Sequence, residues 1–256
     1  MVKILVIGEL CVDRFIYGKV ARMCPEAPVP VLNPIEIIEN NGMAGNVVDN
    51  LNALSQDVEV LHWHQSNKIE KIRFVDKKSN QMIVRVDEGE LLPIVPLSFL
   101  SPEQKKTISE SDIVIISDYN KGYLPNHTII EISNFSKFTL MDSKKKLDYD
   151  LIEYIDFIKL NEVEYKNNKE LVDEYAEKFL ITLGADGAQH NSTLYPSKNP
   201  QDTIDVSGAG DTFIASFSLM YYKTKDISKS IEFANDACAN VVNKKGVAVP
   251  DETFRV

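Results

Sequence analysis

The sequence has few cysteines and no long hydrophobic run. Its three cysteines, Cys11, Cys24 and Cys238, form no Cys-x-x-Cys pair, which predicts reduced thiols and argues against disulfides or a zinc site. No apolar segment is long enough to cross a bilayer, so no membrane partner is expected. The amino-terminal run MVKILVIGEL soon reaches Glu9 and Asp13, and we interpret it as a buried strand rather than a signal peptide. These absences predict a soluble, cytoplasmic protein.

Positive charge and glycine are also scarce. The chain has 28 Lys and Arg against 38 Asp and Glu, with a net charge of -10, so it lacks the basic footprint that a nucleic acid requires. Eleven glycines in 256 residues are few, which makes their placement informative. They form spaced pairs beside strand ends or helix starts, where ligands approach the backbone of open α/β sheets. These pairs are Gly42 and Gly45, Gly184 and Gly187, and Gly208 and Gly210.

What the sequence does have is an alternation of short apolar runs with helical patterns. At 256 residues, of which 44% are hydrophobic, the chain can form one sizeable domain. Near-continuous apolar strands between helices predict a parallel sheet with crossover helices. A helix is expected at about 44–54, and two more follow Asp211, the second stopping near Gly246. The expected strands are VKILVIG, VEVLHW, DIVIIS, KFTLMD, YIDFIKL and KFLITLG.

Two segments break this pattern. PVPVLNPIEII carries strand alternation with prolines, and KIRFVDKKSNQMIVRVDE alternates on either side of a polar turn at 77–80. Together they predict a small antiparallel sheet that stands off the main domain, a candidate lid formed by about 14–40 and 70–90. The alternative is an extension at the edge of the main sheet.

The stretch DVSGAGD contains a glycine-rich turn without the lysine of a P-loop. Because a helical pattern follows, Gly208, Ala209 and Gly210 are expected at a helix start, where free N–H groups and the helix dipole bind an anion. Asp211 is then placed to accept a proton from an attacking hydroxyl. The alternative is that Asp211 only caps its helix.

DVSGAGDTFIASF and NGMAGNVVDNLNALS resemble the two signatures of the PfkB/ribokinase family of carbohydrate kinases, and the resemblance spans nearly the whole chain. It implies a ribokinase-like three-layer α/β/α fold with a mostly parallel central sheet and a small β-sheet lid. It also implies ATP-dependent phosphoryl transfer, with Asp211 as catalytic base. In this family the amides of Gly208, Ala209 and Gly210 form the anion hole.

The resemblance also implies ligands for the sugar. Asp13, in GELCVD, matches the carboxylate that binds sugar hydroxyls, although a capping or turn aspartate is the alternative. Gly42 and Asn46 match the sugar-contacting glycine and asparagine. Met43 stands where the family commonly has a second glycine, and this replacement could narrow the pocket.

On the nucleotide side, KLNEVEY resembles the Asn-x-x-Glu motif. Its Asn161 and Glu164 are implied to organise Mg²⁺ and the nucleotide phosphates, largely through water. The segments that line the nucleotide in this family are matched by TLGADG, FANDACANVV and KKGVAVP. The residues just before Gly208 match a K⁺ site found in many relatives. The implied nucleotide contacts are Thr182, Gly184, Gly187, Asn235 and Gly246, and the implied cation ligands are Asp205 and Ser207.

A narrower resemblance bears on the sugar. DRFIYGKVARMCPEAPVPV, RFVDKKSNQMIVRVDE and SDYNKG are similar to the kinase half of the bacterial bifunctional heptose 7-phosphate kinases/heptose 1-phosphate adenylyltransferases, which serve lipopolysaccharide synthesis. The implied reaction is phosphorylation of O1 of D-glycero-D-manno-heptose 7-phosphate. A phosphorylated substrate needs a cation, which arginine suits. Arg85 and Lys121 are the favoured candidates, and Arg14 and Arg22 are two others. The alternative for each of the four is a surface charge that binds no ligand.

The chain also departs from these relatives. It is shorter than these relatives after VEVLHW and between 161 and 180, and the adenylyltransferase half is absent from it. A compact sugar-phosphate kinase, with a lid that pairs with a second subunit's lid, is therefore the favoured interpretation. The alternatives are a kinase for another acceptor, such as fructose 6-phosphate, ribose or a nucleoside, and a shortened, inactive sugar-binding protein.

Overall fold

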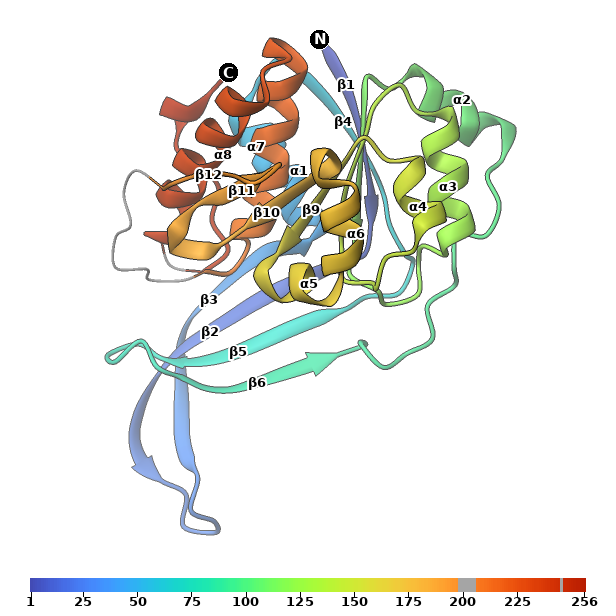
Figure 1. Ribbon diagram of the computed structural model, residues 1–256. Coiled ribbons are helices and arrows are strands. Elements are labelled where there is room, and N and C mark those ends of the chain that lie inside the picture. Colours follow the sequence, from blue (N-terminus) through green and yellow to red (C-terminus); the bar gives the residue numbers. More distant parts are fainter. Residues whose placement is uncertain (198–205, 245) are drawn as a thin grey trace.

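The computed structural model describes residues 1–197, 206–244 and 246–256, and this part of the chain contains two sheets (Figure 1). The main sheet has the strand order β12-β11-β10-β9-β8-β7-β1-β4. Neighbouring strands from β4 to β10 pair in parallel, and β11 and β12 are antiparallel additions at one edge. Its strands are β1 (Val2–Gly8), β4 (Val58–Trp63), β7 (Ile113–Asp118), β8 (Thr139–Ser143), β9 (Phe157–Asn161), β10 (Phe179–Thr182), β11 (Ala188–His190) and β12 (Thr193–Tyr195).

Helices cover both faces of the main sheet, which confirms the three-layer α/β/α prediction (Figure 1). Each face has its own hydrophobic core, because strands buried on both sides present apolar side chains in both directions. One core packs α1 (Ala44–Leu54), α7 (Ala209–Thr224) and α8 (Ile227–Val242). The other packs α2 (Pro102–Glu110), α3 (Asn126–Phe135), α4 (Tyr149–Glu153), α5 (Glu162–Asn167) and α6 (Lys169–Glu174).

Local chemistry sets several helix ends. Ser101 and Gln104 form a capping box at the start of α2, and the Asp226 side chain caps α8. Helix α1 has the predicted bounds. Helix α8 ends at Val242, so the expected stop at Gly246 is wrong, although Gly246 does take a left-handed φ of 72° in the following loop.

The second sheet stands off the main domain, with the order β3-β2-β5-β6 (Figure 1). Its strands are β2 (Leu10–Met23), β3 (Pro30–Met43), β5 (Glu70–Asp76) and β6 (Met82–Glu88). It is a separate sheet, not an edge extension of the first. The prediction of an antiparallel sheet is only partly right, because β2 pairs with β5 in parallel. Periodicity predicts a strand but not the direction of its partner.

The two faces of the second sheet differ in burial. Side chains alternate between the faces of a strand, and along β2 the buried ones are Cys11, Asp13, Phe15 and Tyr17. Val247, in the loop after α8, packs against Phe15 and Tyr17. The Asp13 face therefore points toward the main domain. Among the described residues, no helix is long and apolar enough to span a membrane.

Candidate active site

Asp211 lies buried in the first turn of α7. The helix begins after Gly208, which acts as N-cap with a φ of 83°, a left-handed conformation that glycine adopts without strain. Because Asp211 is the third helical residue and no side chain caps this helix, the capping alternative does not match the geometry. Its carboxylate accepts hydrogen bonds from Asn46 Nδ2 at 2.9 Å and from the Tyr119 hydroxyl at 2.8 Å.

The surroundings of Asp211 give its carboxyl group an unusual pKa. Burial is the largest influence and raises the pKa, as does the nearby Asp142 carboxylate; with all influences together the pKa is about 6. Hydrogen bonds from Asn46 and Tyr119, together with the charge of Lys159, favour the ionised form and lower it. The group is therefore mainly ionised at neutral pH, and it accepts a proton more readily than an exposed aspartate does.

A relay of side chains sets the orientation of Asn46. Asn50 donates to Asn46 Oδ1 at 3.0 Å, and Thr212 donates to Asn50 Oδ1 at 2.8 Å. With its amide oxygen thus engaged, Asn46 turns its NH₂ group toward Asp211. Asn46, which was expected to bind sugar, contacts the candidate base and joins α1 to α7.

A buried ion pair lies beneath the start of α7. Lys159 Nζ and Asp142 Oδ2 are 2.9 Å apart, and both side chains are almost fully buried. A Cβ atom on Gly210 would lie 2.7 Å from Lys159 Nζ, so a side chain there would displace the lysine's ammonium group. Burial opposes the lysine's charge, but Asp142 and Glu164 outweigh it and raise the pKa of Lys159.

Asn161 and Glu164 form a capping box at the start of α5. Lys144 pairs with Glu164 and lies 3.9 Å from Asp142 Oδ1, a buried oxygen without a hydrogen-bond partner. Among the described residues, no group of three or more His, Cys, Asp and Glu side chains is placed to hold a metal ion. Glu164 and the free oxygen of Asp142 therefore fit Mg²⁺ that keeps water and phosphate as most of its ligands.

On the second sheet, Asp13 forms an ion pair with Arg73 across β2 and β5. A Cβ atom on Gly42 would collide with the Asp13 carboxylate and with Cys11 Sγ, so only glycine leaves this carboxylate its place. Met43 follows with φ 57° and ψ −135°, a backbone conformation that favours glycine. Met43 is itself buried at the start of α1, beside Cys11.

The expected phosphate-binding cations lie in different surroundings. Arg85 is half exposed, pairs with Asp87 and lies opposite Arg73 in the register of β5 and β6. Lys121 pairs with Glu90. The other two candidates are less well placed: Arg14 lies on the opposite face of β2 from Asp13, and Arg22 is exposed in the projecting part of β2.

The residues expected at the nucleotide occupy loops and helix ends around α7 and α8. Strand β10 ends at Thr182. Gly184 begins the short 3-10 helix that comes next and Gly187 follows it, and both glycines have a positive φ. Asn235 is buried in α8 and donates to the Tyr195 carbonyl at 2.8 Å. Gly246 faces the Phe15 ring of the second sheet. Ser207 directly precedes the cap of α7, and Asp205 lies outside the described residues.

Five site residues were not identified from the sequence, although most of them carry a detectable signal. Glu9, Tyr119 and Asp142 lie at or just beyond the carboxyl ends of parallel strands, where ligands bind in open α/β sheets. Lys159 is a lysine within an otherwise apolar strand. Arg73 lies two positions from Lys71 on an alternating strand, but the sequence alone does not show that it faces Asp13.

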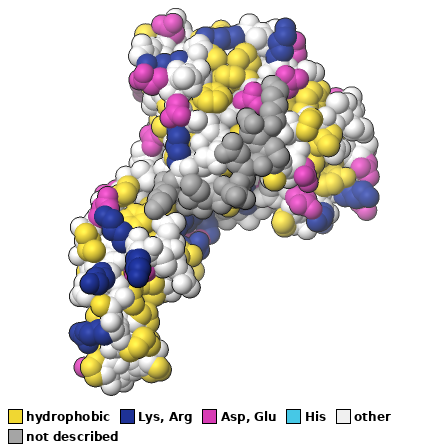
Figure 2. All heavy atoms as spheres, turned by 90° about the vertical axis from the view of Figure 1, so that its left-hand side faces the viewer, with side chains coloured by type: hydrophobic (Ala, Val, Ile, Leu, Met, Phe, Trp, Pro, Cys, Tyr) yellow, Lys and Arg dark blue, Asp and Glu magenta, His cyan; other side chains and the backbone are white. Residues whose placement is uncertain are grey.

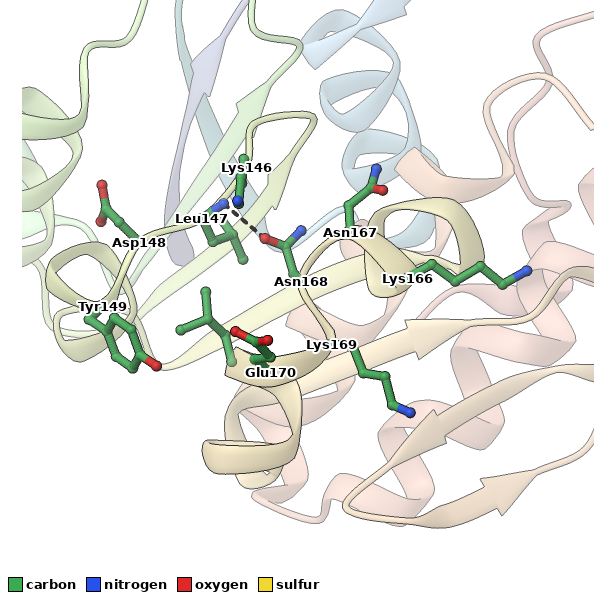
Figure 3. Close-up of a pocket in the computed structure, with 10 residues that line it drawn as sticks. Lys146, Leu147, Asp148, Tyr149, Lys166, Asn167, Asn168, Lys169 and Glu170 are labelled. Carbon is green, nitrogen blue, oxygen red and sulfur yellow. Dashed lines mark hydrogen bonds between the residues drawn. The ribbon is translucent and has the colours of Figure 1, made fainter.

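Two hollows adjoin α5. The larger, of about 530 Å³, lies between the segment after β8 and helices α5 and α6, with Lys146, Lys166 and Lys169 among its lining (Figure 3). The smaller, of about 300 Å³, includes Lys144 and Glu164. Neither is lined by Asp211 or Asp13.

Comparison with known proteins agrees with this geometry. Residues 48–253 match the family model described as pfkB family carbohydrate kinase. The chain is 34% identical to the bifunctional protein HldE of Helicobacter pylori strain J99 over 303 residues, and 33% identical to that of Helicobacter hepaticus over 300. These matches include 97% and 96% of the chain but only 64% and 61% of the relatives. Since 303 exceeds the chain's 256 residues, the relative also carries segments that this chain lacks.

Solved structures share the fold at low identity. Ribokinase from Arabidopsis thaliana, complexed with ribose and ATP, superimposes with a TM-score of 0.70 at 16% identity, covering 99% of this chain and 97% of the other. Phosphofructokinase-2 from Escherichia coli, in complex with potassium, gives 0.69 at 14% identity with the same coverage. With the family model matching most of the chain, the protein belongs to the pfkB family of carbohydrate kinases, which are phosphotransferases.

Proposed function

We propose that this chain is an ATP-dependent sugar kinase in which Asp211 is the catalytic base. The observation that carries the proposal is the buried carboxylate at the start of α7, held by Asn46 and Tyr119 and with its pKa raised to about 6. A group of this kind accepts a proton from an acceptor hydroxyl as that hydroxyl attacks phosphorus. In the described part of the chain, the other polar clusters have no buried carboxylate in the first turn of a helix that begins with a glycine-rich stretch.

In the proposed mechanism, the amides of Gly208, Ala209 and Gly210 stabilise negative charge on the transferred group at the positive end of α7. Asn46 keeps the Asp211 carboxylate turned toward the acceptor hydroxyl. When bound, ATP supplies the phosphoryl group and Mg²⁺ neutralises its charge. Glu164 and Asn161 would hold the ion through water.

The nucleotide would bind along the carboxyl ends of β9 and β10, the start of α7, and α8 with the loop that follows it. Gly184 and Gly187 leave the backbone accessible there, and Thr182, Asn235 and Gly246 complete the proposed set. Ser207 and Asp205 would serve a K⁺ ion. We further propose that residues 1–256 form one kinase domain, with segments 14–40 and 70–90 as a lid that closes over the sugar.

For the acceptor we propose a sugar phosphate, D-glycero-D-manno-heptose 7-phosphate, phosphorylated at O1. Support comes from the relatives named HldE and from the match around EAPVP. Asp13 would bind sugar hydroxyls beside Gly42, and a group of cations near it would bind the phosphate. Arg73 contacts Asp13 directly. Arg85 lies opposite Arg73 on the neighbouring strand β6, and Lys121 pairs with Glu90 in the segment that follows β6.

An acceptor panel tests this proposal. ADP release is measured with MgATP and heptose 7-phosphate, unphosphorylated heptose, fructose 6-phosphate, ribose and a nucleoside. We expect the highest kcat/KM with heptose 7-phosphate, and a loss of about 100-fold or more without its phosphate, because Arg–phosphate bonds are charge-assisted. Preference for another acceptor would reassign the sugar. No turnover and no nucleotide binding would instead favour the inactive sugar-binding protein, which the missing segments support and the intact Asp211 and Glu164 oppose.

The outer face of the second sheet carries an apolar row. Ile37, Ile16, Phe74 and Val84 are register neighbours on the face opposite Asp13, and Ile37 and Val84 are 60% and 49% exposed. Figure 2 shows hydrophobic side chains on this projecting part. We propose that the same face of a second copy covers the row in a homodimer, because self-complementary apolar faces associate in C2 dimers.

If so, Val84→Lys should shift the protein from dimer to monomer, because it places a charge in the apolar contact. The mass is measured by light scattering on a sizing column. Val95→Lys, which introduces the same charge at an exposed valine in the loop before α2, is the control and should stay dimeric. If the wild-type protein were still monomeric at about 100 μM, any dimer would have a dissociation constant weaker than that concentration, and this would count against the proposed dimer.

A further inference from the structure

We propose that Tyr119 is a positioning residue for the base, one whose hydroxyl keeps the Asp211 carboxylate oriented and ionised. This inference rests on the role proposed for Asp211. Tyr119 belongs to the loop that follows β7, whereas Asp211 lies 92 positions later, in α7. The two side chains meet because the Tyr119 loop and the start of α7 lie together at the carboxyl edge of the main sheet.

The Tyr119 loop is held in place by a buried carboxylate. Glu9, just beyond β1, has no exposed surface and accepts hydrogen bonds from the backbone N–H groups of Tyr119, Lys121 and Tyr123 at 2.8, 3.0 and 3.2 Å. Asn120 between them takes a left-handed φ of 56°. Three bonds from alternate residues to one carboxylate fix the course of this loop, and they determine where the tyrosine ring can lie.

Two cations lie near the ring of Tyr119. Lys71 Nζ, from the second sheet, is 5.8 Å from the ring centroid, and Lys144 Nζ, which pairs with Glu164, is 5.6 Å from it. Both distances are within the range of cation–π attraction. The ring is therefore held from the sugar side and from the proposed Mg²⁺ side, and its hydroxyl reaches Asp211 Oδ1 at 2.8 Å.

The charges around Asp211 determine the sign of the effect. Asp142 on β8 raises the pKa of Asp211, and Lys159 on β9 lowers it. The neutral amide of Asn46 on α1 and the hydroxyl of Tyr119 both donate hydrogen bonds to Asp211, and both favour its ionised form. Burial and the Asp211 charge hold the pKa of Tyr119 well above its usual value, so the hydroxyl remains a donor at ordinary pH. Removing it therefore raises the pKa of Asp211.

The test compares Tyr119→Phe with Tyr123→Phe, which loses a hydroxyl from a buried tyrosine of the same loop. Because a base must be ionised, activity falls as pH drops through the pKa of Asp211. In Tyr119→Phe we expect the acid limb of kcat/KM to move up by about one pH unit, the size of one hydrogen bond to a charged group. Relative to wild type, activity then falls about twofold at pH 7 and approaches a tenfold loss below pH 6. Tyr123→Phe should match the wild type.

A second measurement does not depend on the sugar. The Asp211 carboxyl is titrated by NMR in ¹³C-aspartate-labelled protein, and its signal is assigned by its absence in Asp211→Asn. An upward shift in Tyr119→Phe and not in Tyr123→Phe supports the inference even if the acceptor panel fails. An Asp211 pKa that is the same in wild type and Tyr119→Phe overturns it, and leaves the proposed kinase function to the acceptor panel.

Discussion

Replacing Asp211 by asparagine is expected to abolish phosphoryl transfer and to leave nucleotide binding intact. Asparagine has the shape of aspartate. Its amide oxygen can accept from Asn46 while its NH₂ group donates to the Tyr119 hydroxyl oxygen, but it cannot take a proton from the acceptor hydroxyl. General-base catalysis contributes about 10²- to 10⁴-fold, so we expect kcat to fall at least 100-fold. The backbone amides of the anion hole are unchanged, and the Kd of MgATP should stay within about twofold of wild type.

The measurements are ADP release with the best acceptor and calorimetric titration with MgATP. Asp226→Asn is the matched control, because it makes the same substitution at the N-cap of the neighbouring helix α8, where asparagine caps as well as aspartate. Turnover and stability of this control should match the wild type. If Asp211→Asn kept near-full turnover, the base would have to be another group, and the proposed mechanism would be wrong.

The second large effect is expected from Lys159→Met, which removes the nearer and more buried of the two cations beside the Asp142 carboxylate. Removing one partner of a buried ion pair typically costs about 3–5 kcal/mol, because the remaining charge is buried and uncompensated. Asp211 would also lose the lysine charge that lowers its pKa, so the repulsion from Asp142 raises the pKa of the base further. We therefore expect a less stable protein whose remaining activity requires higher pH.

Urea denaturation measures the change in the free energy of unfolding. Lys166→Met is the control, because Lys166 pairs with Glu162 on the surface of α5, and exposed pairs contribute about 0–1 kcal/mol. Adding Asp142→Leu to Lys159→Met should recover part of the lost stability, since it removes the uncompensated charge. Equal, small losses in Lys159→Met and Lys166→Met would contradict the role given to the buried pair.

Much of the fold could be predicted from local patterns. Helix α1 has the expected bounds because its start and end depend on nearby residues, and the buried strands were recognisable as apolar runs between helical patterns. The helix start at DVSGAGD was predictable for the same reason, since Gly208 takes the left-handed conformation that a turn into a helix uses. Where distant segments had to pair, prediction failed, as with the parallel pairing of β2 and β5.

Local sequence patterns predicted six strands of the main sheet, helices α1, α7 and α8, and the stretch DVSGAGD as a helix start that carries an acid. Only the tertiary structure decided what that acid touches. Asn46 and Tyr119 lie 165 and 92 positions from Asp211, and Arg73 lies 60 positions from Asp13. Such contacts depend on how strands are ordered in the sheets and on which face each side chain takes, and no local pattern encodes these. They turn an aspartate in a glycine-rich turn into a buried group with a raised pKa.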